Sequence, residues 1–183
     1  MFERYLIENC SPTLASLKTA SMFTYDYLSE QELQGHVEYW NACLKDKGIS
    51  IVVLRKKMNK SLIYVYRRSS LKAVLQNSDA ENFLHMFGYN SAKPEYAISL
   101  LKERLQTGED FPHEIGVFLG YPLDDVVEFI KNKGQNSRTT GYWKVYCNEN
   151  DAKRTFEKYK KCKRVYGALW NDGRSIIKLT VSA

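Results

Sequence analysis

The stretch ISIVVLRKKMNKSLIYVYR, residues 49–67, decides the fold. Two apolar runs rich in β-branched and aromatic residues, 49–54 and 62–67, stand on either side of the polar turn KKMNKS. This arrangement predicts two strands joined as a β-hairpin. Because the second run is apolar on both faces, we expect the hairpin to lie at the centre of a sheet.

The segment before the hairpin predicts a helix over residues 29–48. Ser29 and Glu32 have the spacing of a capping box, and Gly48 is a typical helix end. The apolar residues of this segment recur at helical spacing: Leu33, Val37, Trp40 and Leu44.

Nearer the N-terminus, the stretch NCSPTLA (9–15) has the composition of a helix start. Ser11 is a good N-cap residue and Pro12 suits the first helical turn, so we expect a short helix over 12–19. A strand over 21–25 is expected to follow it.

Beyond the hairpin, helical patterns alternate with polar loops. Residues 109–134 predict two short helices around the turn Gly120-Tyr121-Pro122, 131–141 predict a polar loop, and 141–146 predict a further strand. The tail 174–183 fits either a strand or a last helical turn. Further helices are expected over 70–76, 79–87, 94–106 and from Asn148 or Asn150 to about Trp170.

Together these elements predict an α+β fold, a mixed α/β arrangement in which helices cover a sheet of roughly four strands around the central hairpin. The chain has 183 residues, the length of one domain, and contains no repeat, low-complexity tract or linker. We therefore expect residues 1–183 to form a single globular domain.

Composition favours the cytoplasm and no membrane partner. No stretch approaches the roughly 18 apolar residues of a membrane span, and the N-terminus lacks the apolar run of a signal peptide. The 4 cysteines lie far apart and form no CxxC pair, so we expect free thiols in a reducing compartment.

Positive charge is concentrated near the C-terminus. Residues 131–183 hold 13 Lys and Arg against 4 Asp and Glu, a net charge of +9. The long helix that ends near Trp170 is amphipathic, and its basic side is either a plain solvated face or a site for an anionic ligand. The residues of such a site would be Lys153, Lys160, Lys161 and Arg164, with Tyr142 and Trp143 stacking on a planar group.

Several other kinds of site are disfavoured. The two short helices within 109–134 suggest a helix-turn-helix, but Asp124, Asp125 and Glu128 would stand where a DNA-reading helix meets phosphates, which argues against sequence-specific DNA recognition. The sequence contains no phosphate-binding glycine motif, nucleophile elbow or zinc-ligand spacing, so it indicates no metal site and no particular cofactor.

Cys10 is the candidate nucleophile. At the expected helix start its thiol would lie near free N–H groups, which lower the pKa of a thiol. A thiol nucleophile needs a base, and His113, beside Glu114 at another expected helix start, is the best placed of the 3 histidines. Cysteine is also a common small buried hydrophobe, so a structural Cys10 is the alternative.

Several stretches together resemble a family of unknown function, DUF3793. They are NCSPTLASLKTASMF (9–23), FPHEIGVFLGYPLDDVVEFI (111–130), GYWKVY (141–146) and FEKYKKC (156–162). The resemblance covers nearly the whole chain and implies a single-domain, cytoplasmic bacterial protein. It implies no activity.

Two functions are left open. The first is a binding module for an anionic or planar ligand, and the second is a thiol-dependent enzyme or redox-responsive protein that uses Cys10 with His113. The lack of a complete catalytic motif favours the binding module. The identity of the ligand and of any cofactor is not readable from the sequence.

Overall fold

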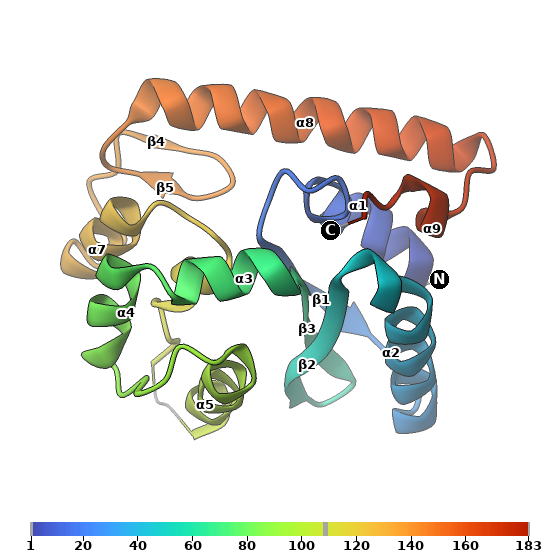
Figure 1. Ribbon diagram of the computed structural model, residues 1–183, viewed down its shortest axis with the longest axis horizontal. Coiled ribbons are helices and arrows are strands. Elements are labelled where there is room, and N and C mark those ends of the chain that lie inside the picture. The colour runs from blue at the N-terminus through green and yellow to red at the C-terminus, as the bar shows by residue number, and fades with distance from the viewer. Residues whose placement is uncertain (1, 108–109, 183) are drawn as a thin grey trace.

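The computed structural model describes residues 2–107 and 110–182 and has a three-stranded antiparallel sheet at its centre (Figure 1). The strands are β1 (Ala20–Asp26), β2 (Ile49–Lys57) and β3 (Lys60–Arg67), in the spatial order β1–β3–β2. The predicted hairpin is β2–β3, and β3 pairs with both of its neighbours.

The sheet has three strands, not the expected four or so, because residues 141–146 do not join it. That region forms a separate two-stranded ladder of β4 (Thr139–Thr140) and β5 (Lys144–Val145). The N–H of Gly141 donates to the carbonyl of Trp143, so the chain turns back on itself where a continuous strand was expected.

Both faces of the sheet are buried, as the apolar hairpin predicts. Along β3, Ile63 and Val65 enter one core cluster, whereas Tyr64 and Tyr66 enter another. This alternation follows from the pleat, which sends successive side chains to opposite faces.

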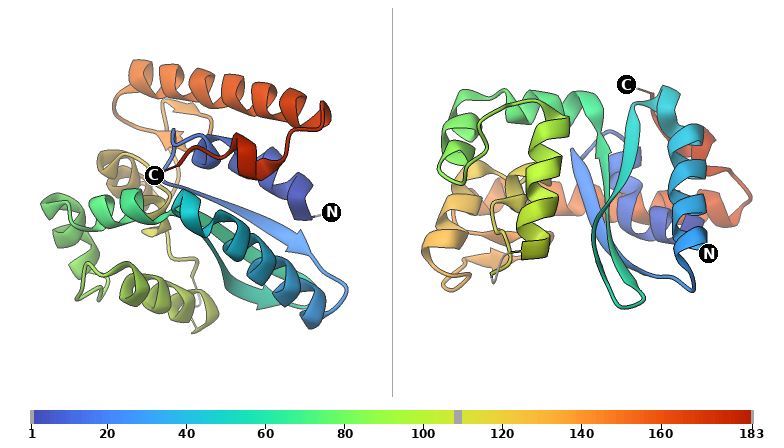
Figure 2. Two further views of the ribbon diagram at one scale, coloured as in Figure 1. Left: turned by 45° about the vertical axis from the view of Figure 1, so that its right-hand side comes forward. Right: turned by 90° about the horizontal axis from the view of Figure 1, so that it is seen from below.

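Each face of the sheet has its own cover of helices (Figure 2). The face that we call the α1 side is covered by α1 (Phe2–Leu14), α2 (Glu30–Leu44) and α9 (Ile176–Leu179). The opposite face, the α5 side, is covered by α3 (Arg68–Leu75), α4 (Ser78–His85), α5 (Pro94–Thr107), α6 (Ile115–Phe118) and α7 (Leu123–Lys131). A 3₁₀ turn, η1 (Lys45–Lys47), connects α2 to β2. The mixed α/β fold with a helix-covered sheet is therefore confirmed.

The long helix α8 (Glu149–Asn171) crosses both sides (Figure 1). Near its start, Phe156 packs with Val145 of β5, and near its end Tyr166 and Trp170 pack against the core of the α1 side. Among the described residues, no helix is both long and apolar enough to cross a bilayer.

Most expected helices are confirmed to within a few residues. Ser29 caps α2 by accepting from the N–H of Glu32, and Gly48 follows η1 with a φ of 74°. The tail, for which two conformations were left open, forms the short helix α9. The two-helix segment expected over 109–134 corresponds to α6 and α7, and its first residue lies outside the described part of the chain.

The helix predicted over 12–19 is wrong, because α1 spans Phe2–Leu14 and ends where that helix was expected to begin. Leu6, Cys10 and Leu14 recur at helical spacing and are fully buried against the sheet. Pro12 lies in the last turn of α1, where its missing N–H removes one helical hydrogen bond, and the helix ends two residues later.

Arg67, at the end of β3, fastens α1 and the C-terminal tail to the sheet. Its Nε donates to the carbonyl of Thr13, and its Nη2 donates to the carbonyls of Leu14 and Val181, each at 2.7 Å. The guanidinium is buried at the carbonyl end of α1, where the helix dipole favours positive charge.

Candidate functional site

A mainly apolar cavity of about 300 Å³ lies on the α5 side, between α6, α7 and the turn that joins β4 to β5. Nine of its lining residues fall within residues 111–129 and four within 140–144, while Met22 reaches it from β1. Cavities of this kind, apolar with a few polar side chains, are typical of small-molecule sites.

Asp125, in the first turn of α7, holds the wall of the cavity together. Its Oδ1 accepts from the backbone N–H groups of Tyr146 and Cys147 at 2.8 and 2.9 Å, and its Oδ2 accepts from Nε1 of Trp143 at 2.8 Å. Only 3% of Asp125 is exposed. One buried carboxylate thus satisfies three N–H donors and fixes the β4–β5 turn against α7.

Trp143 is the central ring of the aromatic wall. It stacks on Tyr121 with ring centroids 5.2 Å apart and meets Phe156 edge-on at 4.5 Å. Because its indole N–H is bonded to Asp125, the ring is fixed in position as well as packed. The wall is therefore largely pre-formed.

Gly120 and Gly141 permit the close approaches that shape this region. Gly120 has a φ of +73°, and a Cβ there would lie 2.5 Å from Oγ1 of Thr19. A Cβ on Gly141 would lie 2.3 Å from the ring of Phe156. Neither position accepts a larger residue without movement of its neighbours.

Two basic side chains line the cavity and share one aromatic neighbour. The ring of His113 lies 4.9 Å from that of Phe129, and Nζ of Lys144 lies 5.9 Å from the same ring. Lys144 also donates to the carbonyl of Gly134 at 2.6 Å, whereas His113 is exposed.

Glu114 has a different environment from its neighbour His113. It is 1% exposed and accepts from Nε of Arg104 at 2.6 Å and from the hydroxyl of Tyr89 at 3.2 Å. Burial and the adjacent carboxylate raise the pKa of Tyr89. The hydrogen bonds of Glu114 therefore join α5 to α6. Among the described residues, no hydrogen bond links Glu114 to His113.

Cys10 is fully buried inside α1 and not beside a helix N-terminus as expected. Burial raises the pKa of its thiol to about 12, although nearby Lys18 favours the thiolate. Burial likewise lowers the pKa of Lys18 to about 8. Cys10 belongs to the core of the α1 side, and no hydrogen bond among the described residues joins it to His113.

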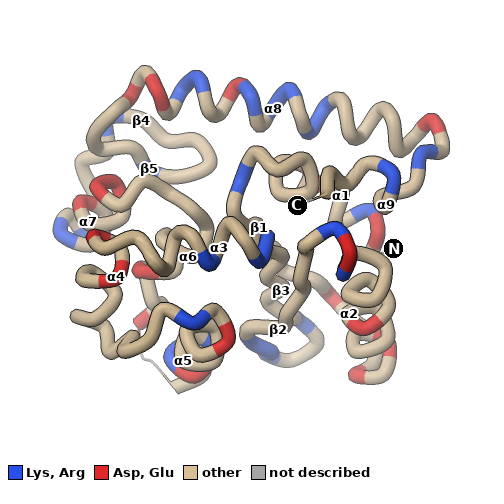
Figure 3. Tube along the Cα trace, viewed as in Figure 1, with Lys and Arg blue, Asp and Glu red and all other residues tan. Residues whose placement is uncertain are grey.

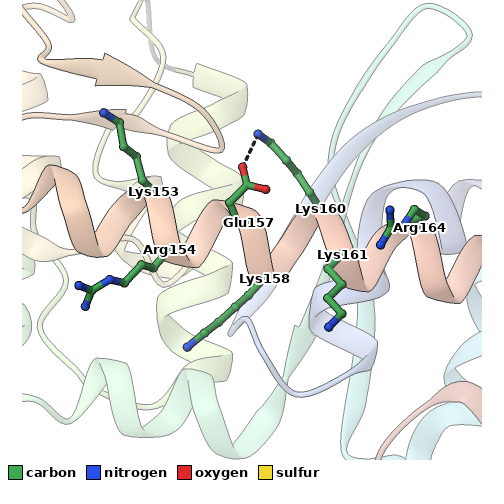
Figure 4. Close-up of a pocket in the computed structure, with 7 residues that line it drawn as sticks. All are labelled: Lys153, Arg154, Glu157, Lys158, Lys160, Lys161 and Arg164. Atoms are coloured by element: carbon green, nitrogen blue, oxygen red, sulfur yellow. Dashed lines mark hydrogen bonds and ion pairs between the residues drawn. The ribbon is translucent and has the colours of Figure 1, made fainter.

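The basic face of α8 lies on the outside of the molecule (Figure 3). Its side chains leave the helix in different directions, with Lys160 on one side and Lys158 and Lys161 on the other (Figure 4). Lys160 pairs with Glu157 at 2.8 Å, and Lys153 pairs with Glu149. Among the described residues, no carboxylate lies within ion-pair distance of Lys161 or Arg164. The face is thus an open charged surface on which only some of the cations are paired.

The structure separates the aromatic and basic residues that the sequence analysis grouped as one ligand site. Tyr142 is half-buried, edge-on to Tyr159 at 5.0 Å and beside Phe156, and Trp143 lines the cavity. The lysines and Arg164 of α8 point to solvent. His113 and Trp143, assigned to different hypotheses from sequence, line the same cavity.

Sequence reasoning missed Asp125, Phe129 and Lys144 as parts of a site. Asp125 had an ordinary explanation at a helix N-terminus, and Lys144 had one as an exposed lysine on a strand. The available signal was the tryptophan at position 143, because a packed indole N–H requires an acceptor.

The fold and the cavity define a mixed α/β protein in which helices enclose a three-stranded antiparallel sheet beside a cavity of small-molecule size. The chain belongs to the family described as a protein of unknown function, DUF3793, whose family model matches residues 6–180. Neither the curated proteins nor the solved structures contain a match to the chain.

Three of the four stretches that carry the family resemblance meet at the cavity. Met22 lies within residues 9–23, nine lining residues lie within 111–130, and three lie within 141–146. Thr140 alone among the lining residues falls outside these stretches. In the described part of the chain, the cavity included, no group of three or more His, Cys, Asp or Glu side chains is arranged to hold a metal ion.

Proposed function

We propose that this protein is a binding module whose ligand is a planar small molecule held in the cavity of the α5 side. The observation that carries the proposal is the composition of the cavity lining: nearly all of it comes from the stretches that carry the family resemblance. Aromatic rings fixed by hydrogen bonds and packing, as Trp143 is, provide a ready surface for a flat ligand.

The pre-formed wall also supports binding over catalysis. Asp125 is committed to three N–H groups and Glu114 to Arg104 and Tyr89, so neither carboxylate is placed as a general base. Cys10 is buried with a raised pKa, and we do not propose the thiol-dependent activity.

Isothermal titration with neutral 2-naphthamide, a flat two-ring probe, tests the proposal. We expect saturable binding to the wild type and at least about tenfold weaker binding to Thr140→Trp, because Thr140 is exposed and lines the cavity. Gln135→Trp is the matched control, since Gln135 is exposed on the same connection and does not line the cavity. Equal binding by both variants and the wild type would contradict the proposal.

The outer face of α8 supports a second candidate function, the binding of a polyanion. The observation that favours it is the set of cations without a carboxylate partner among the described residues, which includes Lys161 and Arg164. A single-stranded oligonucleotide is the probe, and its affinity should fall steeply as salt rises.

Two double variants test this second candidate. We expect the double variant Lys161→Gln/Arg164→Gln to weaken oligonucleotide binding more than Lys153→Gln/Lys160→Gln does. The reason is that Lys153 and Lys160 are already paired with Glu149 and Glu157. If binding does not depend on salt, or if the two double variants weaken it equally, the claim that Lys161 and Arg164 bind the oligonucleotide is rejected.

We further propose that residues 1–183 form one domain and that the protein works in the cytoplasm of a bacterium. The shared helix α8 supports the single domain, because it packs on the core of the α1 side and on the β4–β5 ladder. The four cysteines are all free thiols, which is usual in a reducing compartment. Fractionation of the producing cells, with detection of the native protein, tests the location.

A further inference from the structure

We infer that the ligand of the cavity is a planar aromatic acid whose carboxylate is bound between Lys144 and His113, an inference that rests on the proposed function. The cavity has one acidic and two basic side chains in its lining. What these three side chains already contact decides which charge a ligand can bring.

The acidic side chain offers little to a cationic ligand. Asp125 is 3% exposed, and its two carboxylate oxygens accept three N–H bonds from Trp143, Tyr146 and Cys147. A cation that drew this carboxylate away would leave those buried donors without partners, at a cost of about 1–3 kcal/mol for each such group. The negative charge of the lining is therefore committed to the protein.

Lys144 brings a positive charge that the protein leaves uncompensated. Its Nζ is fixed by one hydrogen bond to the carbonyl of Gly134 at 2.6 Å, which uses one of its three N–H donors. No described carboxylate lies within ion-pair distance of it. A fixed ammonium with donors to spare binds an anion without first losing side-chain freedom.

His113 stands beside the same ring and completes the anion site. Its imidazole contacts Phe111 at 5.8 Å and Phe129 at 4.9 Å between ring centroids. No hydrogen bond or ion pair to another described residue occupies its ring nitrogens. One imidazole nitrogen always carries a hydrogen when the ring is neutral, so His113 can donate to a carboxylate whether or not it is charged.

The apolar remainder of the lining determines the body of the ligand. Tyr121 and Trp143 form a stacked pair in the wall, and Ile115 and Val126 are buried beside them. A flat hydrocarbon body against this wall leaves its carboxylate to the two basic side chains of the lining, Lys144 and His113. Binding of such a ligand combines buried apolar area with one charge-assisted contact.

Three probes with one ring system and three charges test the inference: 2-naphthoate, 2-naphthamide and 2-naphthylmethylamine. Isothermal titration at low salt should show 2-naphthoate binding the wild type about tenfold more tightly than the neutral amide, and the cationic amine most weakly. In Lys144→Met the preference for the acid over the amide should disappear while the amide keeps its affinity. His113→Gln should reduce the preference by a smaller factor.

The outcomes separate the two claims. If the amide binds the wild type as tightly as the acid does, the inference about charge is overturned and the cavity remains a site for a flat neutral ligand. If none of the three probes binds, the proposed function is rejected and this inference with it. The comparison of probes on the wild type needs no variant, so a poorly folded Lys144→Met does not prevent a decision.

Discussion

The two sides of the sheet are covered in different ways. On the α1 side, α1 and α2, of 13 and 15 residues, pack on the sheet around the cluster that contains Cys10. On the α5 side, α6 and α7 have 4 and 9 residues and change direction at Gly120. The short helices, with a sharp turn between them, leave a cavity beside the sheet, whereas the two longer helices bury Cys10. The comparison shows that Cys10, the candidate nucleophile, is buried in the core of the α1 side. The cavity of the α5 side is lined mainly by apolar and aromatic side chains.

The largest loss of stability should come from substitution of Arg67, which joins α1 and the C-terminal tail to the sheet. Arg67→Ala removes the donor of two buried carbonyls and one partly buried carbonyl, together with a large buried side chain, so the free energy of unfolding should fall by about 4 kcal/mol. Urea unfolding followed by circular dichroism measures it. Arg68→Ala is the control, because Arg68 donates mostly from an exposed position, and an equal loss in both variants would contradict the role of Arg67.

Asp125 is the corresponding residue of the α5 side. Asp125→Ala leaves three N–H donors without their acceptor, and we expect a loss of about 3 kcal/mol in the free energy of unfolding. The neighbouring Asp124 is exposed, so Asp124→Ala should change stability by less than about 0.5 kcal/mol. Urea unfolding of the two variants gives the comparison, and similar midpoints would show that Asp125 does not organise the wall.

Gly120 connects the two sides through its contact with Thr19, just before β1. Gly120→Ala combines an unfavourable φ of +73° with a Cβ placed 2.5 Å from Oγ1 of Thr19, and should cost about 2 kcal/mol. Gly173→Ala has a φ of +87° and open space around its Cβ, so it measures the backbone cost alone, about 1 kcal/mol. Thermal unfolding of both variants separates the two contributions. Equal costs would mean that the loop at Thr19 adjusts freely.

The last prediction concerns the titration of Cys10, whose contribution to stability depends on pH. The unfolded thiol has a pKa of about 8.5, whereas burial raises that of folded Cys10 to about 12. Above pH 8.5 the unfolded chain releases this proton first, so stability due to Cys10 falls by up to about 1.4 kcal/mol per pH unit until pH 12. Lys18, whose folded pKa is lowered to about 8, acts in the opposite sense between pH 8 and about 10.4, because there the unfolded chain binds more protons.

Cys10→Ala isolates the contribution of the thiol. The difference in stability between the wild type and this variant, from urea unfolding at pH 7.5, 9 and 10, should shrink as pH rises. Iodoacetamide should modify the partly exposed Cys43 and Cys147 of the native protein and spare Cys10. A difference that is independent of pH, or rapid alkylation of Cys10, would mean that the thiol is not sealed in the core.

The sequence predicts the elements well where local pattern and tertiary role agree. The hairpin and α2 follow from apolar periodicity with a capping residue, and both are found as expected. α1 was misplaced because Ser11 and Pro12 have the composition of a helix start, yet the apolar spacing of Leu6, Cys10 and Leu14 outweighs that local signal once the sheet is present.

The cavity was only partly predictable. His113 and Trp143 were singled out from sequence, but their joint membership of one cavity depends on contacts between segments about 30 residues apart. The hydrogen bond from Trp143 to Asp125 could not be predicted either, because no local sequence pattern specifies which buried donor a carboxylate will accept from. The sequence correctly predicted that the basic residues of α8 form an exposed face. That this face is separate from Tyr142 and Trp143 could be seen only in the folded structure.

Helix α8 has a consequence for how the molecule fluctuates. Its first half lies over the cavity wall through Phe156, and its second half is anchored in the α1 side through Tyr166 and Trp170. A single continuous helix cannot detach at one end and keep the register of its other contacts unchanged. Amide hydrogens in its second half should therefore exchange more slowly when a ligand fills the cavity, which makes the far end of α8 a remote reporter of occupancy.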